Sequence, residues 1–132
     1  MERLKQRLEI AWQALMTLEE LSVLKQPSAI ERDAAIQRFE YTVEASWKAA
    51  KRYLSIVEGI DSGSPKGVIR YLRESGFFSD DEATLALEMI DDRNLTSHTY
   101  NKEIAERLFS RIPNYTQLLN VWITRMKTNL KN

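Results

Sequence analysis

Apolar residues recur every three or four positions along most of the chain, and helix-breaking residues are few and clustered. In the first segment this spacing places one apolar stripe on a single helix face, formed by Leu4, Leu8, Ala11, Leu15 and Leu18. Only four glycines and three prolines interrupt the 132 residues. No segment alternates apolar and polar residues with the β-branched enrichment of a strand. The sequence therefore predicts an all-α fold.

Capping residues predict where each helix begins and ends. We expect helices at about 2–25, 29–58, 65–75 and 80–97, followed by one that starts after Asn101. Ser28 and Glu31 have the spacing of a capping box, Ser79 or Asp80 is expected to cap the fourth helix, and Gly76 is expected to end the third. Pro113 should break or kink the last helix, because proline lacks the N–H that a helix interior needs. Short connections favour an antiparallel up-and-down bundle of five to six helices in a single domain, 1–132.

Composition excludes several kinds of site. The chain has 19 basic residues (Lys and Arg) and 19 acidic residues (Asp and Glu), so its formal net charge is zero. Any contact with nucleic acid must therefore use a local basic patch. With no cysteine and one histidine, the chain has no thiol nucleophile, Cys-ligated zinc or multi-histidine metal site. We therefore expect no metal and no cofactor. The N-terminal MERLKQRLEI interleaves charges with apolar residues, which predicts a cytoplasmic protein without a signal peptide or membrane span.

Polar groups are concentrated in MIDDRNLTSHTYN, residues 89–101. Arg93 offers a planar cation suited to a phosphate, and His98 is the natural general acid or base near neutral pH. Residues five apart lie ~140° apart around a helix, so these two converge only if the helix ends between them or two copies face each other. The alternative is structural: a histidine near a helix C-terminus is favoured by the helix dipole, and an arginine beside two aspartates is usually a surface ion-pair cluster.

Three separated blocks resemble the HEPN superfamily, in particular its nucleotidyltransferase substrate-binding protein branch. They are IQRFEYTVEASWKAAKRYL at 36–54, GSPKGVIR at 63–70 and MIDDRNLTSHTYN. HEPN proteins carry an R-x4-6-H motif with a polar residue after the arginine, matched here by Arg93, Asn94 and His98. The related toxin branch extends this motif to R-x4-H-x-Y, which Tyr100 completes.

The resemblance implies a helical bundle that forms a homodimer, with arginine and histidine of both protomers meeting in a shared cleft. Many HEPN proteins are metal-independent ribonucleases in which the RNA 2′-OH attacks the adjacent phosphate. Members of this branch are usually encoded beside a minimal nucleotidyltransferase and bind it. In the toxin–antitoxin form that partner transfers AMP to the motif tyrosine, here Tyr100. A bulky anion at that position would block an arginine-lined cleft.

Two basic groups are candidates for phosphate or RNA contacts. Lys48 and Arg52 lie near the end of the second helix, beside Lys51, while Lys66, Arg70 and Arg73 share one face of the third. The alternative for both groups is an ordinary solvated helix face.

Other patterns are interpreted as structural. Gly63-Ser64 with the later Asp80, Asp81 and Glu82 superficially resembles a nucleotidyltransferase signature, but the segments are predicted helical, so Ser64 and Asp80 are expected to be caps. Together with the resemblance, this predicts that the chain is the partner of a transferase and not the transferase itself. The carboxylate pairs Glu40/Glu44 and Glu88/Asp92 are interpreted as solvated or ion-paired faces. Trp12, Phe39, Trp47 and Trp122 are expected in the core, and Phe77-Phe78 is expected to plug one end of the bundle.

Three hypotheses for function remain open. The leading one is a HEPN-type toxin with endoribonuclease activity, regulated by nucleotidylation at Tyr100. The second is a non-catalytic substrate-binding subunit of a two-chain nucleotidyltransferase. The third is a purely structural helical dimer.

Overall fold

The computed structural model describes residues 1–131, and within them all regular structure is helical. The five α-helices are α1 (Glu2–Ser22), α2 (Ala29–Tyr53), α3 (Pro65–Glu74), α4 (Asp80–Asn94) and α5 (Lys102–Leu130). A π-helical turn, η1 (Leu54–Glu58), extends α2, and a 3-10 turn, η2 (Thr96–His98), follows α4. The predicted all-α bundle is confirmed. No helix in this described part combines the length and apolar character needed to cross a lipid bilayer.

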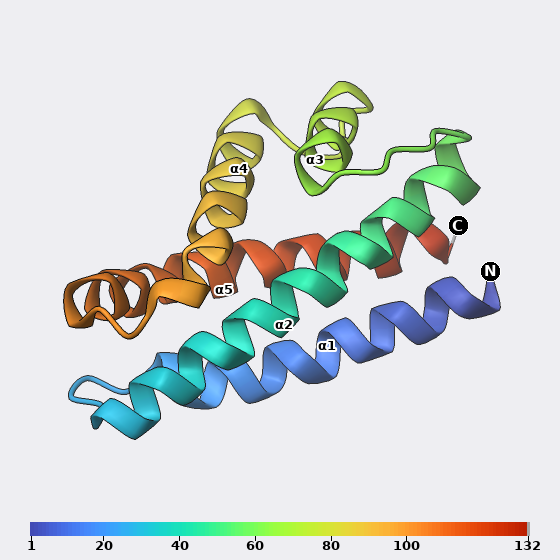
Figure 1. Cartoon of the computed structure of the whole chain (residues 1–132). Helices are drawn as coiled ribbons and strands as arrows, with labels where there is room; N and C mark the ends of the chain where they lie inside the picture. Colours follow the sequence, from blue (N-terminus) through green and yellow to red (C-terminus); the bar gives the residue numbers. More distant parts are fainter. Residues whose placement is uncertain (132) are drawn as a thin grey trace.

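The three long helices α1, α2 and α5 lie side by side, and α3 and α4 cover one side of α2 and α5 (Figure 1). The short loop after α1 makes α1 and α2 antiparallel. The α3–α4 excursion then returns the chain to the start of α5, so α5 runs in the same direction as α2 (Figure 1). This topology brings the C-terminal end of α4 against the middle of α2. It thereby places the segment 89–101 on the central helix of the bundle.

The predicted caps form as expected. Ser28 Oγ accepts from the Glu31 backbone N–H at 3.1 Å, and the Glu31 carboxylate accepts from the Ser28 N–H at 2.9 Å. Ser79 and Glu82 repeat this reciprocal arrangement at the start of α4. Gly76 follows α3 with φ of 82°, a left-handed conformation that glycine adopts without a side-chain clash.

Three predictions of where helices end are wrong. The first helix ends at Ser22 rather than near residue 25. The fourth helix ends at Asn94 rather than near residue 97, because the chain tightens into the 3-10 turn η2. Pro113 does not divide the last helix, which continues without a break from Lys102 to Leu130. Pro113 is exposed, whereas Ile112 and Tyr115 beside it are buried. Burial of these neighbours offsets the loss of one hydrogen bond on the solvent side.

The aromatic residues separate into core and surface positions. Phe39 and Trp122 are fully buried, and Phe77 and Phe78 are buried with Phe78 edge-on to Trp122. The Phe pair is therefore buried as part of the core, in the connection between α3 and α4 and against α5. Trp12 and Trp47 are only partly buried, against the prediction that both lie in the core. Trp47 is partly exposed because hollows adjoin it on two sides.

Candidate functional site

Arg93 in the last turn of α4 reaches across to α2. Its Nη2 donates to Glu44 Oε2 at 2.9 Å, forming an ion pair between two partly exposed side chains. The same Glu44 carboxylate accepts from Trp47 Nε1 at 3.1 Å and lies 3.3 Å from Lys48 Nζ. The Glu44 carboxylate thus contacts three side chains: Arg93 of α4, and Trp47 and Lys48 one turn farther along α2. The hypothesis of a structural ion pair for Arg93 is correct in part, although the partner is Glu44 and not the neighbouring aspartates.

The charge state of Glu44 reflects these contacts. Burial would raise the pKa of its carboxyl, but hydrogen bonds from Trp47 and Lys48 and the charge of Arg93 together hold the pKa below the ordinary value. Glu44 is therefore ionised at neutral pH. An incoming phosphate has to compete with this carboxylate for the guanidinium.

A small cavity of about 190 Å³ opens beside Arg93, lined by Val43, Glu44, Trp47, Pro65, Ile90, Arg93 and Asn94. Arg93 Nε is buried and has no hydrogen-bond partner among residues 1–131. Arg93 also lines the cavity, and an arginine guanidinium can present two parallel donors to a phosphate. Asn94 is exposed at the edge of the same cavity, where its amide can orient a bound group. The structure thus brings Arg93 and Asn94 to one cavity.

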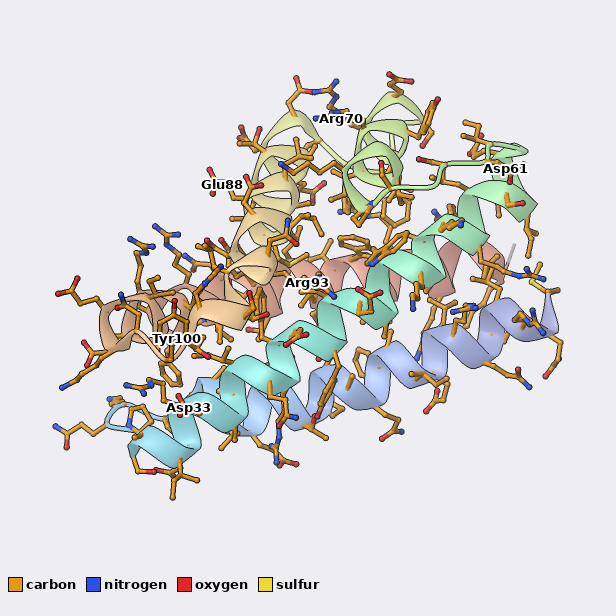
Figure 2. The ribbon with its side chains drawn as sticks, viewed as in Figure 1. Asp33, Asp61, Arg70, Glu88, Arg93 and Tyr100 are labelled. Atoms are coloured by element: carbon orange, nitrogen blue, oxygen red, sulfur yellow. The ribbon has the colours of Figure 1, made fainter. Side chains whose placement is uncertain are left out.

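His98 and Tyr100 occupy the connection between α4 and α5. His98 ends the turn η2 and is exposed, and its ring meets that of Tyr100 edge-on with centroids 6.1 Å apart. Tyr100 is 86% exposed, the most exposed large apolar or aromatic side chain in the described chain. Figure 2 shows Arg93 where α4 crosses α2 and Tyr100 farther along, near the start of α5. No hydrogen bond joins Arg93 to His98 anywhere in residues 1–131, although the helix does end between them.

The two aspartates before Arg93 have separate roles. Asp92 is buried and accepts from Arg111 Nη1 at 3.0 and 3.2 Å and from the Tyr115 hydroxyl. Burial, together with the hydrogen bond to Asp92, raises the pKa of Tyr115. Asp91 is exposed and forms an ion pair with Lys66 at 2.6 Å. Asp92 is therefore a structural residue that holds α4 to α5, and Asp91 tethers α3 to α4.

The predicted basic groups lie in different places. Arg70 and Arg73 are exposed on α3, and Figure 2 shows Arg70 pointing away from the bundle, far from Arg93. Lys66, on the same helix, is already paired with Asp91 of α4. Lys48 and Arg52 instead line a hollow whose wall includes Trp47, next to the Arg93 cavity. Of the two groups, the one on α2 is adjacent to the motif.

Sequence reasoning missed two contributors. The sequence pattern indicates Glu44 only as one of a carboxylate pair with Glu40, whereas its contact with Arg93 spans 49 positions in sequence. Arg7 on α1 lines the same hollow as Arg52. Periodicity within one helix cannot find contacts between helices, although the presence of Trp47 and Lys48 three and four positions after Glu44 was a visible local signal.

Comparison with known proteins decides the family. Residues 6–128 match the family described as nucleotidyltransferase substrate binding protein like. The chain belongs to this family. It is similar to a Haemophilus influenzae protein named "Probable ribonuclease HepT", with 32% identity over 97 residues, covering 68% of this chain. That match spans 65% of the relative's own length, just under two thirds.

Two solved structures share the fold. A crystal structure of a Thermus thermophilus protein is 55% identical, with a TM-score of 0.86, covering 88% of this chain and 98% of that one. A Haemophilus influenzae structure, HI0074, is 26% identical with a TM-score of 0.77 and covers 91% of this chain and 98% of that one. HI0074 is described as having the fold of a substrate binding domain of a nucleotidyltransferase. The resemblance inferred from the sequence blocks is confirmed.

Proposed function

We propose that this family member is a metal-independent endoribonuclease and the toxin half of a toxin–antitoxin pair, partnered by a separately encoded minimal nucleotidyltransferase. The observation that carries the proposal is Arg93, whose buried Nε lacks a partner among residues 1–131 while its guanidinium lines a cavity on α2. The similarity to a protein named as a ribonuclease supports the reaction class. We place the activity in the cytoplasm, where RNA and ATP are both available.

The chemistry needs only groups that the chain supplies. His98 accepts the proton of an RNA 2′-OH, and the 2′-oxygen attacks the adjacent phosphorus. The bond from phosphorus to the 5′-oxygen breaks, the 5′-oxygen takes up a proton, and a 2′,3′-cyclic phosphate remains. Arg93 holds the phosphate oxygens and stabilises the charge that builds up on them, and Asn94 orients the phosphate. No group of three or more Asp, Glu or His side chains in residues 1–131 is placed to hold a metal ion.

A homodimer would complete the site. Within one described chain, Arg93 is turned toward Glu44 while His98 faces solvent. A second copy that faces the first can supply the histidine to the other copy's arginine. We therefore propose a cleft shared by two protomers, in which each phosphate meets Arg93 of one and His98 of the other.

Tyr100 is the proposed modification site. Its exposed hydroxyl can attack the α-phosphorus of ATP on the partner enzyme, forming a tyrosine–AMP bond with release of pyrophosphate. The added anion would lie beside His98, whose ring contacts Tyr100, and would exclude RNA by charge and bulk. Mass spectrometry after incubation with the cognate transferase and ATP is expected to find the label on Tyr100. A labelled peptide that excludes this residue would reject the assignment.

The proposed nuclease is tested by incubating purified protein with RNA in EDTA, beside Arg93→Ala and His98→Ala prepared identically. We expect cleavage by the wild type and loss of at least about 100-fold in each variant, the usual contribution of a positioned acid–base or electrostatic group. Equal cleavage by all three proteins would indicate a contaminating nuclease and remove the support for the proposal.

A second function is favoured by one specific observation. The Arg93 guanidinium is already paired with Glu44, and the family and the HI0074 structure are both described by substrate binding for a nucleotidyltransferase. The chain would then be a non-catalytic subunit that presents a substrate to its partner. Wild-type protein that is unmodified at Tyr100 and inert toward RNA, yet increases nucleotide transfer by the partner enzyme, would favour this function.

A further inference from the structure

A second, larger hollow lies on α2 beside the Arg93 cavity. It has a volume of about 340 Å³ and is formed by α1, the C-terminal part of α2, η1 and the loop that follows. Its lining carries four cations and one carboxylate, in the set Arg7, Lys48, Lys51, Arg52 and Asp61, with Trp47 as an aromatic wall. Figure 2 shows Asp61 on the loop that leaves the end of α2.

The cations of this hollow are largely uncompensated. Lys48 is paired with Glu44, but Arg7, Lys51 and Arg52 form no ion pair within residues 1–131. Lys51 and Arg52 are exposed, and Arg7 is partly buried. Positive charge gathered in a concave surface attracts anions more strongly than the same charge spread over a convex face. The hollow is therefore a local concentration of positive charge on a chain with zero net charge, and such a surface can attract anions.

Trp47 adds a second kind of recognition. Its Nε1–H is held by Glu44 at 3.1 Å, which fixes the orientation of the ring. The indole borders both this hollow and the Arg93 cavity. A fixed aromatic face surrounded by cations is the combination that binds single-stranded nucleic acid, with bases stacking on the ring and phosphates on the cations. An acidic protein segment would use the charges but gain little from the ring.

We propose that this hollow binds one nucleotide of single-stranded RNA, with its phosphate on Arg7, Lys51 and Arg52 and its base against Trp47. Because the indole is shared with the Arg93 cavity, the bound nucleotide flanks the one whose phosphate reaches Arg93. The choice of RNA rests on the proposed function, whereas the site itself rests on the four cations and the indole. The hollow would then determine the position and direction of the RNA strand relative to Arg93, without taking part in the chemical step.

The test measures binding of a fluorescently labelled single-stranded RNA of about seven nucleotides by anisotropy, in EDTA. The His98→Ala protein is used so that the strand stays intact. Lys51→Gln/Arg52→Gln is expected to weaken binding by ~10-fold or more and to lower the slope of log affinity against log salt by up to ~0.7, the contribution of the one phosphate that the hollow holds. Arg7→Gln removes one of the three cations on that phosphate and should lower the slope by less.

Lys25→Gln is the matched control, since Lys25 is an exposed cation in the α1–α2 loop at the far end of the bundle. It should leave both affinity and slope close to those of the parent. Equal binding by the control and the hollow variants, or no binding by the parent protein, would overturn the proposal. Failure of the nuclease would appear separately, as retained binding through the hollow with no cleavage by the wild type.

The base contact has its own readout. RNA should quench tryptophan emission in the parent, and Trp47→Phe should abolish most of that quenching while Trp12→Phe does not. Circular dichroism checks that both variants fold. The alternative occupant of the hollow is an acidic protein segment, and poly-glutamate as a competitor tests for it. If poly-glutamate displaces RNA at equal charge concentration, and the quenching by RNA survives Trp47→Phe, the hollow is a docking surface for an acidic protein. The RNA proposal would then be wrong.

Discussion

Replacing Asp92 by asparagine should reveal that this motif residue holds the fold together. Its carboxylate is 6% exposed and accepts from Arg111 at 3.0 Å and from the Tyr115 hydroxyl. Asparagine keeps one acceptor oxygen but turns an NH₂ group toward one of these donors. The lost charge-assisted bond from Tyr115 is worth ~1.5–3 kcal/mol, and the partner Arg111, about half exposed, adds at most ~1 kcal/mol.

The expected destabilisation is therefore ~1.5–4 kcal/mol. At about 4 °C per kcal/mol for a chain of this length, Tm should fall by roughly 6–16 °C. Asp91→Asn is the matched control, because Asp91 is the adjacent residue and is 61% exposed in its ion pair with Lys66. Its Tm should change by less than about 4 °C, as expected for a surface ion pair. Thermal unfolding followed by circular dichroism measures both, and equal shifts in the two variants would refute the assignment of separate roles.

Three further outcomes are expected. The hydrogen bond from Arg125 outweighs burial and holds the pKa of Glu82 in the folded protein below the ordinary value of 4.5. Its stabilisation is therefore complete above pH 4.5 and is lost as the pH falls from there through the lower folded-state pKa. Glu82→Gln should lower Tm at pH 7 and flatten the acid side of a Tm-against-pH curve, and an unchanged curve would contradict this. Pro113→Ala restores a backbone N–H on an exposed helical face and should raise the free energy of unfolding, measured in urea, by ~1–2 kcal/mol; a decrease would show that the proline stabilises α5. Glu44→Gln removes the ion pair with Arg93 and should tighten RNA binding up to ~5-fold in the His98→Ala protein. The control Glu40→Gln, one turn earlier, should leave RNA binding unchanged. Weaker binding by Glu44→Gln would mean that the Glu44 carboxylate holds the Arg93 guanidinium in the orientation that binds RNA.

The helices were predictable because their signals are local. Ser28 with Glu31, Ser79 with Glu82, and Asn101 each cap a helix through bonds to residues two or three positions away. The same local reasoning allowed a break at Pro113 that does not occur, because burial of the flanking residues outweighs the missing hydrogen bond. Tertiary packing overrode a strong local preference at this position.

The candidate site was predictable in composition but not in geometry. The motif predicts that Arg93 binds an anion, and the structure places Arg93 at a cavity. Its partner Glu44 and the contribution of Arg7 depend on how α4 and α1 pack on α2, which no spacing within one helix reports. Asp91 and Asp92 are adjacent and chemically identical, yet one is exposed and one buried, because successive positions of a helix face different directions.

The most direct test of the central claim mixes two inactive proteins. Arg93→Ala and His98→Ala are each incubated with RNA in EDTA, then mixed, dissociated and reassociated before the assay. In a shared cleft each mixed dimer keeps one intact site, with arginine from one chain and histidine from the other. Random pairing should therefore restore about a quarter of wild-type cleavage. Wild-type cleavage that is lost in both variants and not restored by mixing would show that the two residues do not form a cleft across two chains.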